Sequence, residues 1–217
     1  MKLACQPPIM QRRSHRTRAL ALLGAGLAAA GAFAAVAAAV MKKKTAYRDG
    51  RGRRALPKRR RRVTKMVAAA VGPLGKPYVH GPAALAIGAL LWSRGSRAGA
   101  GAMVLSSVAS GALSKVFDHA LPHRSPPPGR HSPSTPSFPS GHSLETAAVS
   151  LAAAYLLTRE RVGHPLVVVP AALTVPLSSG IGRLYLDRHW VTDILAGWLG
   201  GITVAALSAA VYEAGSA

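Results

Sequence analysis

The sequence predicts an all-α, polytopic membrane protein, built as a helical bundle of about six transmembrane helices. The chain has 217 residues and is 49% hydrophobic, yet its formal net charge is +21. The apolar residues gather in nearly uncharged runs, and most of the basic residues precede residue 63. Alanine and glycine are frequent in the runs, and such small residues allow close helix packing in lipid. A soluble, Ala-rich bundle is the alternative class.

Six apolar runs are the predicted spans. The first has 23 residues without charge, which exceeds the ~20 residues needed to cross a bilayer. Several later runs are shorter, and the segment before the second run is expected to lie in the membrane interface. The runs are residues 19–41, 78–92, 98–114, 143–157, 165–181 and 190–212.

The N-terminal part of the chain differs from the rest in charge. Residues 42–65 carry 13 basic side chains and one acid, Asp49. We expect a flexible segment that contacts anionic lipid headgroups. Nucleic acid is not an expected partner, because Tyr47 is the one aromatic residue there. The predicted organisation is a basic tail (1–18), an anchor or signal-like segment (19–41), a polybasic linker (42–65) and a phosphatase-like membrane domain (66–213).

Ionisable residues stand at the ends of the later apolar runs. Two spans separate the loop after the third run from the loop after the fifth, so both loops lie on the same membrane face. Buried or membrane-depth charges are costly, and their concentration at one face predicts a functional site. The residues are Lys115, Arg124, His142, Arg183, His189 and Asp193.

His189 and Asp193 are four positions apart and would share a helix face. The carboxylate can accept the imidazole Nδ1–H, which leaves Nε2 free to act as a nucleophile. A histidine at a helix start beside an unrelated carboxylate is the alternative. The planar guanidinium of Arg183 can donate two hydrogen bonds to phosphate oxygens. The alternative is a structural arginine whose side chain extends to the membrane interface.

The sequence Pro-Ser-Gly-His at residues 139–142 precedes the fourth run. Ser140 and Gly141 would contribute free backbone N–H groups at a helix start, which attract an anion. His142 is then positioned to donate a proton to a leaving oxygen. The alternative is a serine N-cap beside a solvated histidine.

Two further histidines are weaker candidates for a site. His119 and His123 are four residues apart with Asp118 beside them, a pattern that a metal site can have. Pro122 interrupts any helix there, and a third firm ligand is missing. We therefore expect no metal and no other cofactor.

Together these motifs resemble the type 2 phosphatidic acid phosphatase superfamily over about residues 98–212. The resemblance implies a metal-independent membrane enzyme that hydrolyses a lipid phosphate or polyprenyl pyrophosphate through a phosphohistidine. It implies His189 as nucleophile, Asp193 as its orienting partner and His142 as the acid for the leaving group. The phosphoryl oxygens would be held by Lys115, Arg124, Ser140, Gly141 and Arg183.

The sequence departs from the family pattern at two places. Eight residues separate Lys115 from Arg124, where the family usually has six, and Ser125 follows where a proline is usual. Arg130 is therefore an alternative to Arg124. Gly182 stands where the family often has serine before the arginine.

The resemblance also implies a site on the outer face of the plasma membrane. Six spans with a cytoplasmic N-terminus give this arrangement, but they also put the basic residues 42–65 outside, against the positive-inside tendency. Basic residues of the opposite loops favour the external site; they are Arg94, Arg97, Arg159 and Arg161. The rival function is a non-enzymatic membrane protein whose basic segment binds anionic lipid or nucleic acid. The sequence leaves the oligomeric state open.

Overall fold

The protein is a bundle of helices in a computed structural model that describes residues 8–56, 62–128 and 136–216. All regular structure within these residues is helical, which confirms the predicted fold class. Two short helices and a 3-10 turn, α2 (Ala46–Ala55), α3 (Arg62–Val71) and η1 (Gly72–Gly75), precede α4. The longer helices are α1 (Pro8–Met41), α4 (Pro77–Ser93), α5 (Arg97–Ala120), α6 (Gly141–Arg159), α7 (Pro165–Tyr185) and α8 (Val191–Gly215).

Four of the described helices are long and apolar enough to cross a membrane, so the predicted number of six spans is not confirmed. They comprise Arg12–Met41, Arg97–Ala120, Pro165–Tyr185 and Val191–Gly215. Helix α4 has only 17 residues, because the Gly-Pro-rich turn η1 separates it from α3. Helix α6 is more polar than these four helices. Most of its residues are buried against neighbouring helices, so its surface need not be apolar.

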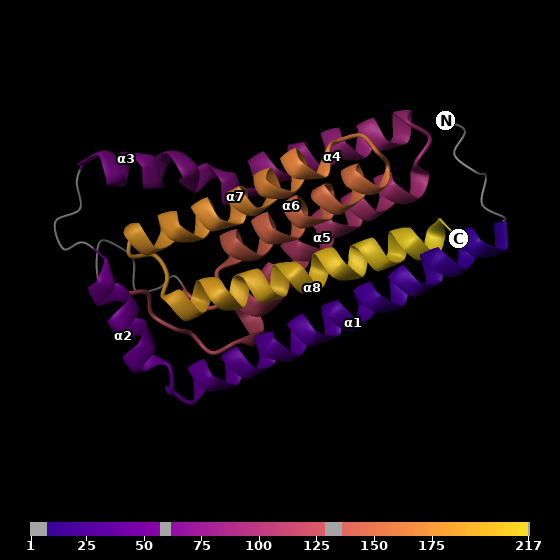
Figure 1. Ribbon diagram of the computed structural model, residues 1–217. Helices are drawn as coiled ribbons and strands as arrows, with labels where there is room; N and C mark the ends of the chain where they lie inside the picture. The colour runs from indigo at the N-terminus through magenta and orange to yellow at the C-terminus, as the bar shows by residue number, and fades with distance from the viewer. Residues whose placement is uncertain (1–7, 57–61, 129–135, 217) are drawn as a thin grey trace.

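The long helices alternate in direction along the bundle. The start of α1 and the C-terminus lie at one end, whereas α2 and the starts of α6 and α8 lie at the other (Figure 1). The segments that follow α5 and α7 therefore meet at the α2 end, as the sequence predicts. We call this the site end. The basic residues of α2 lie at the same end (Figure 1).

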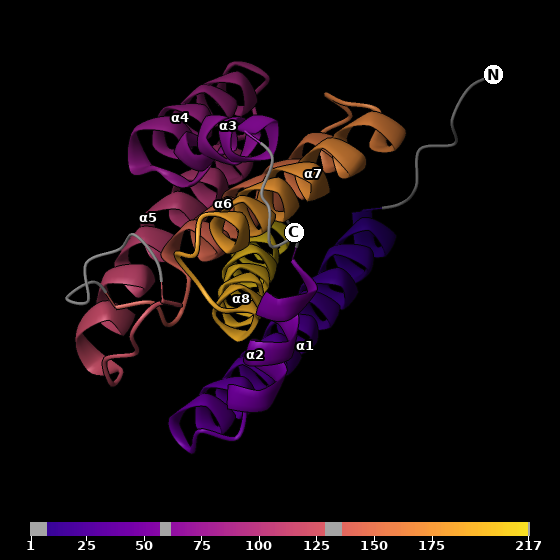
Figure 2. The same ribbon diagram turned by 90° about the vertical axis from the view of Figure 1, so that its left-hand side faces the viewer.

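Helix α6 is the centre of the bundle and contacts α4, α5, α7 and α8. Figure 2 shows α6 and α8 between α5 and α1. Glycines on α8 bring the α6 backbone very close: a Cβ at Gly201 would lie 2.5 Å from the Leu144 carbonyl oxygen, and one at Gly197 would lie 2.5 Å from that of Ser140. The small residues thus serve close helix packing, as expected in lipid.

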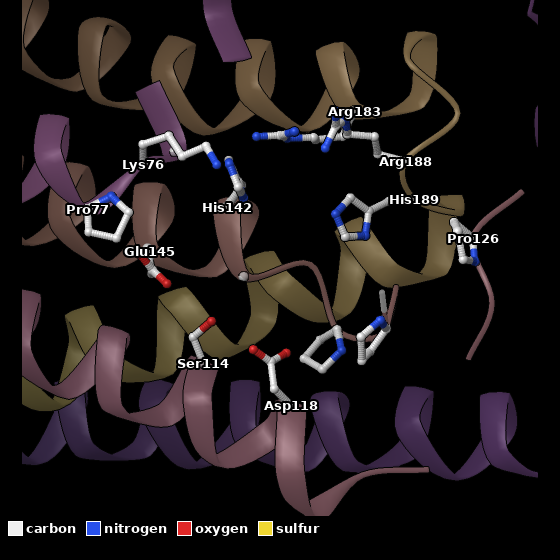
Figure 3. A pocket seen from close by; sticks show the side chains of 14 residues that line it. Lys76, Pro77, Ser114, Asp118, Pro126, His142, Glu145, Arg183, Arg188 and His189 are labelled. Atoms are coloured by element: carbon white, nitrogen blue, oxygen red, sulfur yellow. The ribbon is translucent and has the colours of Figure 1, made fainter. Parts of the chain in front are cut away.

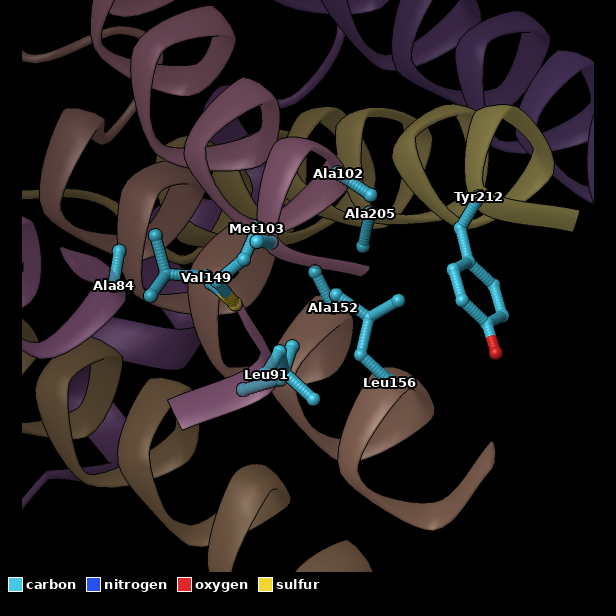
Figure 4. Packing of buried hydrophobic residues seen from close by; sticks show 11 residues of the cluster. Ala84, Leu91, Ala102, Met103, Val149, Ala152, Leu156, Ala205 and Tyr212 are labelled. Carbon is cyan, nitrogen blue, oxygen red and sulfur yellow. The ribbon is translucent and has the colours of Figure 1, made fainter. Parts of the chain in front are cut away.

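Apolar side chains pack between α4, α5, α6 and α8 and also cover the outside of the bundle. Leu91, Met103 and Leu156 are fully buried in the inner cluster (Figure 4). Large apolar side chains such as Leu27 and Leu166 are 70% and 79% exposed. An apolar outer surface of this kind suits contact with lipid rather than water.

The basic segment is more ordered than the sequence predicts. It was expected to be flexible, yet residues 46–55 form helix α2 and residues 62–71 form α3. The single acid of this segment explains the position of α2. Asp49 is 1% exposed and accepts hydrogen bonds from the backbone N–H and hydroxyl of Thr192, at 3.0 and 2.8 Å.

A cluster of paired polar side chains lies at the end opposite the site end. Glu213 of α8 is fully buried. It accepts hydrogen bonds from Tyr155 (2.5 Å) and Arg159 (2.6 Å) and lies 2.5 Å from His15 Nδ1. These contacts connect α8 to α1 and α6. We call Glu213, Tyr155, Arg159 and His15 the Glu213 cluster.

Candidate active site

A cavity of about 560 Å³ lies at the site end. Its walls come from the end of α5, the start of α6, the end of α7, the segment before α8 and the junction of η1 with α4. Figure 3 shows two sides. One side carries Lys76, His142, Arg183, Arg188 and His189, and the facing side carries Ser114, Asp118 and Glu145.

The nitrogen Nδ1 of His189 lies 2.7 Å from the Ser137 carbonyl oxygen. A carbonyl only accepts hydrogen bonds, so Nδ1 carries the proton and Nε2 is left with a free lone pair. The nearest Asp193 oxygen is 3.8 Å from Nδ1, too far for a hydrogen bond. The expected carboxylate partner is therefore replaced by a backbone carbonyl.

Asp193 is fully buried and is held by other donors. It accepts a hydrogen bond from the Trp190 N–H at 2.8 Å, which caps the start of α8. Arg124 Nη1 donates to its second oxygen at 2.5 Å. Asp193 thus contributes its charge near His189 without bonding to it.

Arg124 does not line the cavity, contrary to the expectation that it holds the phosphate. Its Nη1 also donates to the Thr192 hydroxyl at 2.8 Å, and its Nη2 donates to Asp49 at 2.6 Å. Both ends of the guanidinium are therefore occupied by protein groups. The alternative residue, Arg130, lies outside the described residues. We call Asp49, Arg124, Thr192 and Asp193 the Asp49 clamp.

Two other residues that were expected to contact the phosphate, Lys115 and Ser140, also do not line the cavity. Lys115 is exposed and is not part of the cavity wall. Ser140 is fully buried; its hydroxyl caps α6 by accepting from the Ser143 N–H at 3.4 Å. The Ser140 N–H donates to the Asp193 carbonyl at 3.0 Å, so it is already used. Gly141 does line the cavity, close to Ser114 of α5.

His142 and Arg183 lie in the cavity wall as the motifs suggest. Arg183 Nη2 donates to the Gly72 carbonyl at 3.3 Å. His142 Nε2 and Arg183 Nε are buried, and neither has a hydrogen-bond partner among the described residues. A buried polar atom without a partner is costly, which indicates that a ligand completes these bonds.

Several cavity residues were not candidates in the sequence. Lys76 was part of an assumed interfacial segment, although a lysine between Gly75 and Pro77 marks a break between two helices. Arg188 directly precedes His189 and could have been noticed for that reason. Glu145, near the start of α6, also lines the cavity, and its Oε2 lies 2.5 Å from Nε2 of the buried His80.

A metal site does not emerge from the described part of the chain. No group of three or more His, Cys, Asp or Glu side chains there is arranged to hold a metal ion. His119 and Asp118 remain near the cavity at the end of α5, but they lack further ligands in this part of the structure.

The fold and the cavity define a helical membrane protein with a cavity lined by basic side chains and histidines at one end of its bundle. The chain belongs to the PAP2 superfamily, whose family model matches residues 98–215. This is the superfamily that the sequence motifs resemble. The match spans α5 to α8 and so includes His142, Arg183 and His189, while Lys76 and Asp49 lie outside it.

Named relatives agree with this membership. The chain is 39% identical over 69 residues to a phosphatidylglycerophosphatase B from Bacillus subtilis, and 35% identical over 85 residues to an undecaprenyl-diphosphatase from Sulfolobus acidocaldarius. The first alignment covers 34% of the Bacillus protein and 30% of this chain. The second covers 37% of the Sulfolobus protein and 38% of this chain, so each spans only about a third of the relative.

A solved structure resembles nearly the whole bundle. It is the crystal structure of a transmembrane PAP2 type phosphatidylglycerolphosphate phosphatase from Bacillus subtilis. The TM-score is 0.75 at 26% identity, and the match covers 85% of this chain and 94% of that one. The chain is thus a multi-pass membrane protein by its fold.

Proposed function

We propose that this protein is a membrane phosphatase that removes phosphate from a lipid phosphate or a polyprenyl diphosphate. One observation carries the proposal: His142 Nε2 and Arg183 Nε are buried without described partners in the cavity that also contains His189. A tetrahedral phosphate would supply acceptor oxygens to both groups. The names of the relatives support this class of substrate.

In the first step, His189 Nε2 attacks phosphorus while the bond to the leaving oxygen breaks. The Ser137 carbonyl holds the imidazole in the tautomer that this step requires. The buried Asp193 carboxylate, 3.8 Å away, stabilises the positive charge that develops on the ring. The products are a phosphohistidine and the leaving group, which receives a proton from His142.

In the second step, water attacks phosphorus, His142 accepts a proton from that water, and the nitrogen–phosphorus bond breaks, which releases inorganic phosphate and restores both histidines. Arg183 and Arg188 face the cavity and neutralise the oxygens that carry charge in both transition states. The Gly141 backbone at the start of α6 adds the positive end of a helix. This chemistry requires positioned cations and N–H donors.

The substrate enters from the membrane, since the cavity lies at the end of an apolar bundle. Phosphatidic acid, phosphatidylglycerol phosphate and a polyprenyl diphosphate all present a phosphate at that depth. The volume of about 560 Å³ accommodates a headgroup while the acyl or prenyl chains stay in lipid. We take these three compounds as the first panel.

The outer face of the plasma membrane is the proposed location of the cavity. Arg94, Arg97, Arg159 and Arg161 lie in the segments at the opposite end and favour a cytoplasmic position for that end, whereas the basic residues of α2 at the site end count against it. A membrane-impermeant thiol reagent tests this on intact cells. It should label a cysteine at Ser125 in a Cys5→Ser background, and absence of labelling there would reverse the orientation.

The basic helix α2 is proposed to contact anionic headgroups beside the cavity. Its buried Asp49 faces the bundle, whereas Arg48, Arg51 and Arg54 are exposed. Exposed basic side chains near an anionic lipid surface each contribute about 1 kcal/mol of attraction. Charge reversal of these arginines should weaken binding to anionic vesicles, and unchanged binding would refute the contact.

The decisive experiment measures inorganic phosphate release by the detergent-purified protein in the presence of EDTA. We expect His189→Ala to lower release by at least about 10³-fold, as loss of a nucleophile does. His164→Ala is the matched control, because His164 is exposed at the start of α7, far from the cavity. Equal rates for wild type and His189→Ala, with both proteins folded, would refute the proposed mechanism.

A further inference from the structure

The cavity lacks both cations that the first motif of the family would supply. Lys115 is exposed outside the cavity wall, and Arg124 is occupied by Asp49 and Asp193. A phosphate carries up to two negative charges, which must be neutralised away from bulk water. Arg183 and Arg188 remain as cations of the cavity wall, and a further cation beside them would take the place of the two that the motif does not supply.

Lys76 is in the required position. It lines the cavity, and Figure 3 shows its amine end pointing toward the imidazole of His142. Its side chain has no hydrogen bond or ion pair among the described residues, and it is exposed at the cavity mouth. An ammonium group without a protein partner at the edge of an anion site is free to bind the anion.

The backbone just before Lys76 is held by two cavity residues. Gly75 packs flat on His142, so that a Cβ at position 75 would lie 2.5 Å from the imidazole Cδ2 atom. The Gly72 carbonyl accepts a hydrogen bond from Arg183 at 3.3 Å. The 3-10 turn η1 therefore positions Lys76 relative to the proposed proton donor and the proposed phosphate-binding arginine.

We propose that Lys76 binds the substrate phosphate and supplies the charge that the family pattern assigns to Lys115. The inference rests on the proposed function, because it concerns the same cavity. It adds a substrate contact from outside residues 98–215, the part of the chain that matches the family model. In this protein the break between α3 and α4 is thus part of the substrate site.

The test compares inorganic phosphate binding by the full-length protein and by Lys76→Ala. Binding is read from the phosphate concentration that raises the unfolding temperature in detergent, so no turnover is needed. We expect the dissociation constant to rise about 10-fold, the effect of losing one charge-assisted hydrogen bond. Lys76→Arg keeps the charge and should recover most of the affinity.

Lys44→Ala is the matched control, because Lys44 is another exposed lysine at the site end but is not part of the cavity wall. An unchanged dissociation constant in Lys76→Ala overturns the proposal, as does a 10-fold rise in Lys115→Ala with Lys76→Ala unaffected. The readout also separates the two proposals. Phosphate binding that depends on Lys76 in a protein without any phosphatase activity would support this inference and refute the proposed function.

Kinetics with two substrate classes sharpen the assignment. If Lys76 contacts the transferred phosphate, Lys76→Ala lowers kcat/KM equally for a lipid monophosphate and for a polyprenyl diphosphate. If it contacts the phosphate of the leaving group, the loss is confined to the diphosphate. Either pattern supports a phosphate contact, and equal kcat/KM for wild type and variant on both substrates contradicts it.

Discussion

The two ends of the helical bundle both contain buried ionisable side chains, but their charges are satisfied to different degrees. At the far end, Glu213 is bonded by Tyr155 and Arg159 and lies against His15. At the site end, about 30 Å away along α8, Arg183 and His142 keep buried nitrogens without described partners. The first arrangement is closed within the protein, and the second leaves buried donors available to a bound molecule.

The same contrast exists within the site end. In the Asp49 clamp, Asp49 and Asp193 both accept hydrogen bonds from Arg124, and the Thr192 hydroxyl accepts from Arg124 and donates to Asp49. The clamp borders the cavity without entering it. Proximity to the cavity is therefore a weaker indicator of a binding role than an unpaired polar atom that faces it. Three substitutions test this distinction, ordered from the largest expected effect to the smallest.

Arg183→Ala should lower kcat/KM by about 10²–10³-fold, the usual effect of removing one preorganised donor to a charged transition state. The unfolding temperature without substrate should change little, because the variant loses the bond to the Gly72 carbonyl but also removes a buried nitrogen that has no described partner. Steady-state kinetics and thermal unfolding in detergent measure the two effects. A marked fall in stability would mean that Arg183 is a structural residue, against the contrast drawn here.

Glu213→Gln should lower the stability of the protein and leave its activity nearly unchanged. The amide cannot balance Arg159 and turns an NH₂ toward a donor, so the free energy of unfolding should fall by about 2 kcal/mol. The activity of the folded fraction should stay within about twofold of wild type, since Glu213 is some 30 Å from the cavity. Denaturant titration in mixed micelles gives the stability. Glu160→Gln, on the neighbouring Tyr212 contact, is the comparison variant.

Asp49→Asn should have the smallest effect, a loss of about 1 kcal/mol of stability. The amide oxygen still accepts from the Thr192 N–H, and Arg124 keeps its bond to Asp193. Arg48→Gln, an exposed change on the same helix, should have no measurable effect and serves as the control. A loss of activity far beyond the loss of stability in Asp49→Asn would place the clamp among the substrate-binding groups.

Much of this protein could be predicted from its sequence because the relevant signals are local. Apolar runs longer than a bilayer is thick predict membrane helices wherever they occur. Short-range spacing identified His142, Arg183 and His189, since residues at a helix start or one turn apart have nearly fixed relative positions. Alternation of the spans correctly predicted that these residues meet at one end of the bundle, where all three line the cavity (Figure 3).

Long-range pairing decided what local spacing could not. Asp193 and His189 have the spacing of a hydrogen-bonded pair, but Arg124 and the Trp190 N–H bind the carboxylate instead. Asp49 lies 144 positions before Asp193, and the sequence shows it only as one acid in a basic segment. In the structure it is buried and bonded to Arg124 and Thr192.

The sequence by itself determined the fold class, the family and four residues of the cavity wall, namely Gly141, His142, Arg183 and His189. Only the tertiary structure decided which cations are free to bind a phosphate. Lys115 and Lys76 have the same side chain, but of the two Lys76 lies in the cavity wall, because the break between η1 and α4 places it there. The physical reason is that a charge is available to a ligand only where the fold leaves it unpaired and facing the cavity.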